Sequence, residues 1–208
     1  RAARSTSQPR AGADPGANVQ LSASNVQMDR ASIKSFAFGL GQGGNVTVQG
    51  RTGDGSAADS VALTNGSSIL TQTLGPGRGG DVQLTAGTIT MENFALIKTN
   101  TLVGGGDGGD VVLNVGTLSL MRGSSIQSQS KSVTPGLGQG GKVTIQGLPG
   151  AKFGAAESVG LSGGSKLVSE TFGTGHGGRV AITSKSLTMD EATVDAETHS
   201  AGIGGDIV

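Results

Sequence analysis

The chain has 208 residues with 15 basic and 15 acidic side chains, and this formal net charge of zero provides no basic surface for nucleic acid or an anionic membrane. It contains 39 Gly but no Trp, Tyr or Cys, which excludes disulfides and thiolate metal sites and leaves aliphatic side chains to form the core. No apolar run approaches the roughly 20 residues of a membrane-spanning helix, so we expect no membrane span in this segment.

The chain divides into a short polar start and a long repetitive region. Residues 1–13 carry three Arg and no apolar periodicity, and we interpret them as an arm or linker. Residues 14–208 repeat a glycine-rich phrase followed by a strand pattern, which predicts a single repeat domain. The phrase is clearest at residues 39–48 and returns with almost the same letters at residues 136–145. Four weaker copies begin at Gly77, Gly106, Gly175 and Gly202.

Each repeat contains three short strand patterns with period two. The first follows the glycines, as in residues 46–48; the second comes after a turn, as in residues 61–63; the third, as in residues 69–71, has an apolar residue two positions before a small one. Residues i and i+2 of a strand share a face, so a single repeat has three apolar faces that it cannot bury alone. Stacked repeats can bury them, because each strand then pairs in parallel with its counterpart in the next repeat.

The predicted fold is therefore all-β, a parallel β-helix (solenoid) of about six to seven three-strand coils. Six coils at about 4.8 Å each make a rod roughly 30 Å long. We expect glycine at the corners because a corner requires positive φ and close approach between the backbones of successive coils. The structural turn glycines are Gly41, Gly43, Gly44, Gly77, Gly79, Gly80, Gly106, Gly108, Gly109, Gly138, Gly140, Gly141, Gly175, Gly177, Gly178, Gly202, Gly204 and Gly205.

Two repeats carry an extra loop between the first and second strands, at residues 51–60 and 148–158. Loops that recur on one edge of a solenoid are natural partner-binding segments, and the alternative is that they are tolerated insertions. At residues 204–208 the chain enters a new coil, and an uncovered coil exposes unpaired strand edges. We expect either further coils or end-to-end stacking of copies.

The repeated phrase Gly-x-Gly-Gly-Asn/Asp-Val-x-Val/Leu, followed by a strand, Asn-Gly-Ser-Ser-Ile and a Ser/Thr-rich turn, resembles the filamentous haemagglutinin family. These are large exoproteins of two-partner secretion systems in Gram-negative bacteria. The best-matching stretches are residues 43–73, 79–99 and 108–128, and the resemblance covers about residues 14–208. It implies a right-handed β-helix in a secreted or cell-surface fibre that adheres to a host or neighbouring cell, with glycans among the candidate ligands. The amino-terminal secretion domain of that family is not recognisable in this chain.

The glycine-rich stretch around Asp107 and Asp110 fits the nine-residue calcium motif of β-roll toxins. These two aspartates are weak metal candidates, because no neighbouring copy repeats at nine residues and other coils place Lys142 or Arg179 there. We expect neither a metal nor a cofactor.

If the coils stack, the residues that follow each glycine pair form one column along a corner. The column is Asn45, Asp81, Asp110, Lys142, Arg179 and Asp206. In this column Asp110 beside Lys142 and Arg179 beside Asp206 are favourable neighbours. Asp81 beside Asp110 is a like-charge pair that requires solvent or an ion. His176 occupies a position where other coils have other polar residues, and we interpret it as a solvated corner residue.

The best enzyme candidate is an acidic cluster late in the chain, since paired carboxylates act as acid and base in β-helix polysaccharide lyases and hydrolases. Its members are Asp190, Glu191, Asp195, Glu197 and His199. Asp190 occupies the same repeat position as Asp29, however, and Asp195 the same position as Lys34, which favours charged residues filling ordinary repeat positions.

The sequence as a whole favours a structural or adhesive segment without catalysis in a secreted or cell-surface filamentous protein. Two alternatives stay open. One is a self-assembling extracellular filament subunit, and the other is a carbohydrate-active β-helix enzyme using Asp190, Asp195 and Glu197.

Overall fold

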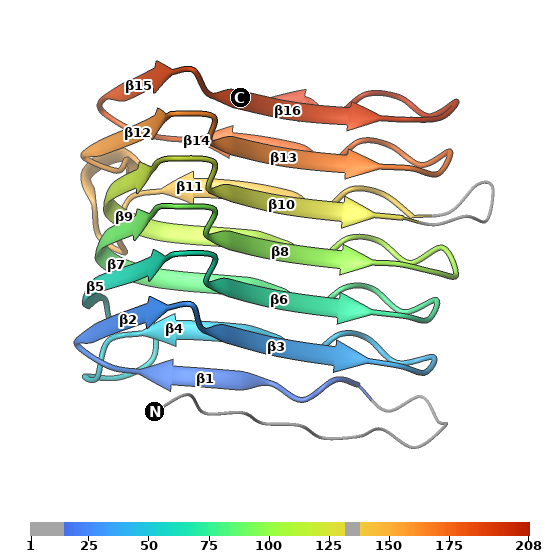
Figure 1. Cartoon of the computed structure of the whole chain (residues 1–208), viewed down its shortest axis with the longest axis horizontal. Coiled ribbons are helices and arrows are strands. Elements are labelled where there is room, and N and C mark those ends of the chain that lie inside the picture. Colours follow the sequence, from blue (N-terminus) through green and yellow to red (C-terminus); the bar gives the residue numbers. More distant parts are fainter. Residues whose placement is uncertain (1–14, 132–137) are drawn as a thin grey trace.

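The structure, a computed structural model, describes residues 15–131 and 138–208, so the arm expected at residues 1–13 lies outside the described residues. The described residues confirm the parallel β-helix, with six complete coils, the start of a seventh and no α-helix (Figure 1). The coil is right-handed, because the front strands in Figure 1 run left to right, those behind run right to left, and the chain rises. No described segment forms a helix of the length and apolarity that a bilayer crossing requires.

The strands follow one another coil by coil. The first three coils contain β1 (Val19–Ser22), β2 (Asn25–Asp29) and β3 (Ser32–Ala37), then β4 (Val46–Gln49), β5 (Ala58–Thr64) and β6 (Ser68–Thr73), then β7 (Val82–Met91) and β8 (Leu96–Thr101). The next three contain β9 (Val111–Leu120) and β10 (Ser125–Ser130), then β11 (Lys142–Gln146), β12 (Ser158–Ser162) and β13 (Lys166–Thr171), then β14 (Arg179–Ile182), β15 (Leu187–Asp190) and β16 (Thr193–Thr198). The 3₁₀ turn η1 (Lys152–Gly154) lies before β12, and β17 (Asp206–Ile207) begins the seventh coil.

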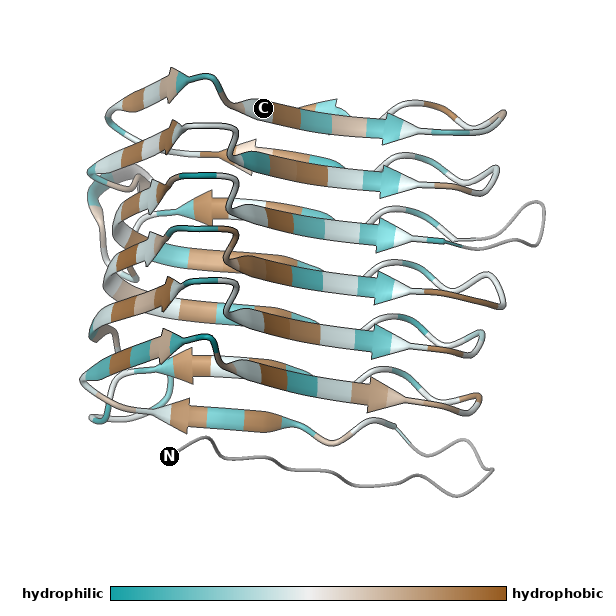
Figure 2. Cartoon of the chain, viewed as in Figure 1, coloured by the Kyte–Doolittle hydropathy of each residue, from teal (hydrophilic) through white to brown (hydrophobic). Residues whose placement is uncertain are grey.

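Successive coils pair in parallel without a slip in register. The first, second and third strand patterns of the repeat form the first, second and third walls of the tube. In the first wall Val46, Val82 and Val111 are direct partners in one column. In the third wall, the six-stranded sheet of β3, β6, β8, β10, β13 and β16, Ile97 pairs with Ile69 on one side and Ile126 on the other. Apolar bands therefore line up from coil to coil in Figure 2, and the inward-facing aliphatic side chains of the central coils are fully buried.

The first and second walls form one bent sheet, which differs from the expected turn between them. In the third and fourth coils β7 and β9 run through both walls as ten-residue strands. Ala86 and Val115 stay in the ladder at the bend, where both are fully buried. In the other coils these two strands are separate, and in the second and fifth coils an inserted loop lies between them. These loops end earlier than expected, at β5 and β12, which start at Ala58 and Ser158.

We call the loops from the third wall to the next coil the glycine corner; it is described at residues 38–45, 74–81, 102–110, 172–178 and 199–205. Of the eighteen turn glycines only Gly138 has a positive φ, so space and not dihedral angle explains most of them. A Cβ on Gly109 would lie 2.0 Å from the carbonyl oxygen of Gly80, and one on Gly80 would lie 2.1 Å from that of Gly44. Positive φ occurs at the neighbouring Gly104 and Gly105 and where the second wall meets the third, as at Asn65.

Small hydroxyl side chains of the third wall fasten the glycine corner to the tube. Thr71 Oγ1 donates a hydrogen bond to the carbonyl of Gly80 and Thr99 Oγ1 to that of Gly109, both at 2.6 Å, and both threonines are fully buried. These bonds satisfy hydroxyls that would otherwise be costly to bury. The small third-wall residue of the repeat therefore fills the narrow part of the tube next to the glycines.

Candidate functional site

The outer face of the third wall carries a cluster of ionisable side chains on its last two strands. Glu170 of β13 lies directly opposite Glu197 of β16 in the parallel ladder. His199 follows Glu197 by two residues and therefore lies on the same face. Its backbone N–H donates to the carbonyl of Thr171 at 2.9 Å, so the ladder geometry continues past the end of the strand.

The imidazole of His199 joins the two carboxylates. Its Nε2 lies 2.9 Å from Oε2 of Glu170 and 3.1 Å from Oε1 of Glu197. The Glu170 side chain is 10% exposed, against 37% for His199 and 43% for Glu197. The ring of Phe172 stacks on the imidazole with centroids 4.3 Å apart and planes 15° apart, which fixes the orientation of the histidine. Lys131 Nζ lies 5.1 Å from the Phe172 centroid.

The surroundings of His199 favour its charged form. The hydrogen bond to Glu170 raises the pKa of His199, desolvation opposes this, and the negative charges of Glu197, Glu170 and Asp195 add to the increase. A carboxylate as buried as Glu170 needs a positive partner, because desolvation of an unpaired charge is expensive. On the same face burial lowers the pKa of the Lys98 ammonium. The positive charge of Lys131 lowers this pKa further, and the negative charge of Glu170 raises it.

Gln129 extends the cluster into the preceding coil. It lies opposite Glu170 in the ladder, and its Nε2 donates to Oε1 of Glu170. Its own Oε1 is buried without a hydrogen-bond partner among the described residues. Sequence reasoning missed both Gln129 and Glu170. The signal for Glu170 was its spacing from Glu197, 27 residues, which equals the spacing of Gly175 and Gly202 in the same two coils.

Only part of the expected enzyme cluster comes together. Asp195 lies opposite Val168, two residues before Glu197 on the same outer face. Asp190 ends β15, which belongs to the other sheet, and Glu191 forms the corner that follows, with φ of 49°. Both residues are exposed, so the structure groups Asp195 with Glu197 and His199 and separates Asp190 and Glu191 from them.

The column after the glycine pairs is a hydrogen-bonded ladder. Asn45 Oδ1 accepts the backbone N–H of Asp81, Asp81 Oδ1 accepts that of Asp110, and Asp110 Oδ1 accepts that of Lys142, at 2.6–2.8 Å. Arg78 lies between the two aspartates, 2.7 Å from Asp81 and 2.9 Å from Asp110. This guanidinium supplies the counter-charge that we expected from solvent or an ion.

The second calcium candidate, Asp107, also has a structural partner. Its Oδ1 accepts the backbone N–H of Gln139 in the next coil at 2.8 Å. Among the described residues, only the cluster of Glu170, Glu197 and His199 brings together three side chains that could hold a metal, so Asp107 and Asp110 do not belong to such a group.

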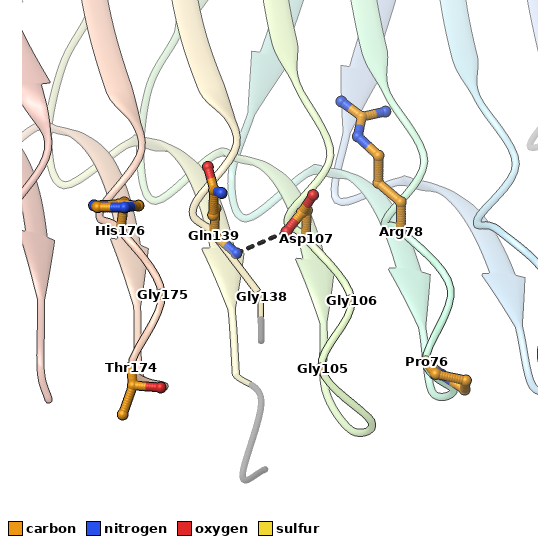
Figure 3. Close-up of a pocket in the computed structure, with 10 residues that line it drawn as sticks. All are labelled: Pro76, Arg78, Gly105, Gly106, Asp107, Gly138, Gln139, Thr174, Gly175 and His176. Atoms are coloured by element: carbon orange, nitrogen blue, oxygen red, sulfur yellow. Dashed lines mark hydrogen bonds between the residues drawn. The ribbon is translucent and has the colours of Figure 1, made fainter. Parts of the chain in front are cut away.

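A shallow polar groove of about 520 Å³ runs along the glycine corner. Figure 3 shows Asp107, Gln139 and His176 side by side in it, each from a different coil, which places His176 in a row of corner residues. The groove is lined by Pro76, Arg78, Gly105, Gly106, Asp107, Gly138, Gln139, Thr174, Gly175 and His176.

Exposed apolar side chains gather on the same corner. Each is at least 41% exposed, although large apolar residues of a repeat usually face its core. They are Phe38, Leu40, Val103, Phe172 and Ile203. This set, the apolar edge, extends from the first coil to the last, because the loops that carry it follow β3, β8, β13 and β16.

Comparisons with family models, with curated proteins and with solved structures find no match to this chain. The features that bear on its function are therefore the regular rod, its apolar edge and the cluster around His199.

Proposed function

We propose that this chain is a structural and adhesive β-solenoid segment of a secreted or cell-surface filamentous protein of the filamentous haemagglutinin type. The observation that carries the proposal is the unbroken register of the coils. The column from Val19 through Val82 to Val180 keeps one inward residue type at one position in six coils. Inward positions elsewhere exchange only small or aliphatic residues, as at Val48 and Leu84, so the larger differences between coils concern the outer side chains and the loops. Such a rod holds its shape through nearest-neighbour contacts and serves as a spacer that presents a variable surface.

The apolar edge supports adhesion as the activity of this surface. A group of large exposed apolar side chains on one surface marks a contact site, and on this corner they recur in the first, third, fifth and sixth coils. The rod holds these side chains on one side, with coils about 4.8 Å apart. The partner in this proposal is the surface of a host or neighbouring cell, and its glycans are candidate ligands. The segment acts without catalysis, at the outer surface of a Gram-negative bacterium.

A bead assay tests the proposal. Beads coated with the purified chain should adhere to cells, and a triple Ser variant of Phe38, Leu40 and Val103 should lose most of this adhesion. Phe172 stays unchanged because it also packs on His199. The matched control is Phe94→Ser, which removes an exposed phenylalanine from a different corner. Adhesion by the triple variant at the wild-type level, with an unchanged circular dichroism spectrum, would contradict the proposal.

A second candidate function is end-to-end self-association, and its alternative is that further coils of the same protein cover the last coil. The inward-facing side chains of Leu187 and Met189 are 47% and 44% exposed, and Ile207 is also exposed. A coil of a second copy stacked on this layer would bury them. Electron microscopy at increasing protein concentration tests this, and rods of one short length at every concentration would rule it out.

Incubation with a panel of polysaccharides tests the third candidate, a carbohydrate-active enzyme. Turnover that disappears in Asp195→Ala would refute our proposal of a segment without catalysis.

A further inference from the structure

We propose that Glu170, Glu197 and His199 form a binding site for a divalent transition-metal ion of the zinc class. Each residue offers one ligand atom, and the three atoms lie within 4.8 Å of one another. Imidazole nitrogen and carboxylate oxygen are both zinc ligands, and three protein ligands leave a fourth position to water. The site is separate from the apolar edge residues Phe38, Leu40 and Val103, so this inference does not depend on the adhesive function.

The ligand atoms already have nearly the required spacing. With bond lengths near 2.1 Å, a tetrahedral zinc site places neighbouring ligand atoms about 3.4 Å apart. In the structure Nε2 of His199 is 2.9 Å from Glu170 and 3.1 Å from Glu197. For an ion to replace the shared proton, these two distances must widen by about 0.3–0.5 Å, and the two carboxylate oxygens, which lie within 4.8 Å of each other, must take the same spacing. The ladder between β13 and β16 holds the two carboxylates, and the Phe172 ring holds the imidazole.

A buried, unpaired acceptor beside the cluster points to a ligand. Gln129 is 6% exposed, its amide contacts Glu170, and its Oε1 has no hydrogen-bond partner among the described residues. A water molecule on the metal would donate a hydrogen bond to this oxygen, which otherwise loses its hydration without compensation.

The chemistry favours zinc-class ions over calcium or magnesium. Calcium takes six to eight oxygen ligands and magnesium demands octahedral oxygen geometry, whereas imidazole suits zinc, copper and nickel. The other charged groups at the site are Asp195 on one side and Lys98 and Lys131 on the other. Glu170 is the most buried ligand and gains most from a positive ion, because its own desolvation is the largest.

The test is calorimetric titration of the chelator-treated full chain with ZnCl₂ at pH 7.5, with CaCl₂ and MgCl₂ as further arms. We expect one zinc per chain and no measurable binding of calcium or magnesium. Glu170→Gln and His199→Gln should each weaken zinc binding by about 10-fold or more. The matched controls are His176→Gln, the only other histidine, and Glu191→Gln, a carboxylate of the same coil outside the cluster; both should bind as the wild type does.

Proton NMR gives an independent reading, since the chain has only two histidines. Zinc should shift the ring signals of His199 and leave those of His176 in place. Equal zinc binding by His199→Gln and the wild type would overturn the proposal. So would the absence of stoichiometric binding, because the cluster would then be a salt bridge to a protonated histidine alone.

Discussion

Replacing Gly109 with alanine should force two coils of the tube apart. Its Cβ would lie 2.0 Å from the carbonyl oxygen of Gly80, and the next nearest atoms are also backbone, so no side chain can rotate away. Carbon and carbonyl oxygen approach to about 3.3 Å, so the coils must separate locally by about 1.3 Å.

That separation breaks hydrogen bonds between the third and fourth coils. Three of these hydrogen bonds lie next to Gly109. They run from Gly79 N–H to Asp107 O at 2.9 Å, from Val82 N–H to Asp110 O at 2.9 Å, and from Asp110 N–H to Asp81 Oδ1 at 2.7 Å. Losing all three costs about 3–5 kcal/mol. This is a large share of the 5–15 kcal/mol that typically separates folded from unfolded states. At about 2–4 °C per kcal/mol, the Tm should fall by about 6–20 °C.

Thermal unfolding followed by circular dichroism measures the effect, with Gly160→Ala as the matched control. A Cβ on Gly160 would have only one neighbour, the Leu118 carbonyl oxygen at 3.8 Å, and its φ is compatible with alanine. This control should leave the stability unchanged or raise it by about 0.4–1 kcal/mol, because alanine lowers the entropy of the unfolded chain. If Gly109→Ala melts within 2 °C of the wild type (about 0.5–1 kcal/mol), the close-approach explanation of the glycine corner is wrong.

Three further predictions concern side chains that join neighbouring coils. Thr99→Val keeps the shape of the side chain but loses the buried hydrogen bond to Gly109, so chemical denaturation should show a free energy of unfolding lower by about 1–3 kcal/mol. The control is the same change at outward-facing Thr90, which should have little effect. Arg78→Gln removes the cation between Asp81 and Asp110, whose side chains are about one-third exposed; the stability should fall by about 0.5–1 kcal/mol at low salt and by less at high salt. The more exposed pair of Arg122 and Glu92 is the control, and an equal effect of Arg122→Gln would contradict the reasoning. The hydrogen bond from Asn65 lowers the pKa of Asp29 below its ordinary value of 3.8. The ionised Asp29 therefore stabilises the folded state above pH 3.8, and this contribution disappears as the pH falls through the lowered pKa. Carbon-detected NMR should show the pKa of Asp29 returning toward 3.8 in Asn65→Ala, and an unchanged titration would refute the assignment.

The coil architecture was predictable because it depends on a local property of the chain. Side chains alternate across a strand, so valine at positions 46 and 48 marks an inward face whatever surrounds it. The same pattern at one repeat spacing after another leaves parallel stacking as the way to bury these faces. The columns of Val46 and Ile97 in the structure are therefore those that the sequence predicts.

The corners were less predictable, because glycine supplies two properties that a sequence does not separate. It permits positive φ, and it leaves room for another backbone. The structure shows that Gly80 and Gly109 are needed for room, while Asn65 adopts positive φ at a different corner. Likewise, the run of β7 through two walls depends on the burial of Ala86 at the bend, which period-two patterns do not encode.

The sequence by itself determined which side chains face inward and how the coils stack. Only the tertiary structure decided which outer side chains meet: Arg78 between two aspartates, and Glu170 against His199 one coil away. The physical reason is that inward positions are constrained by burial, which repeats with the strand. Outward contacts depend on the reach and rotamers of long side chains from different coils, and no period in the sequence constrains those.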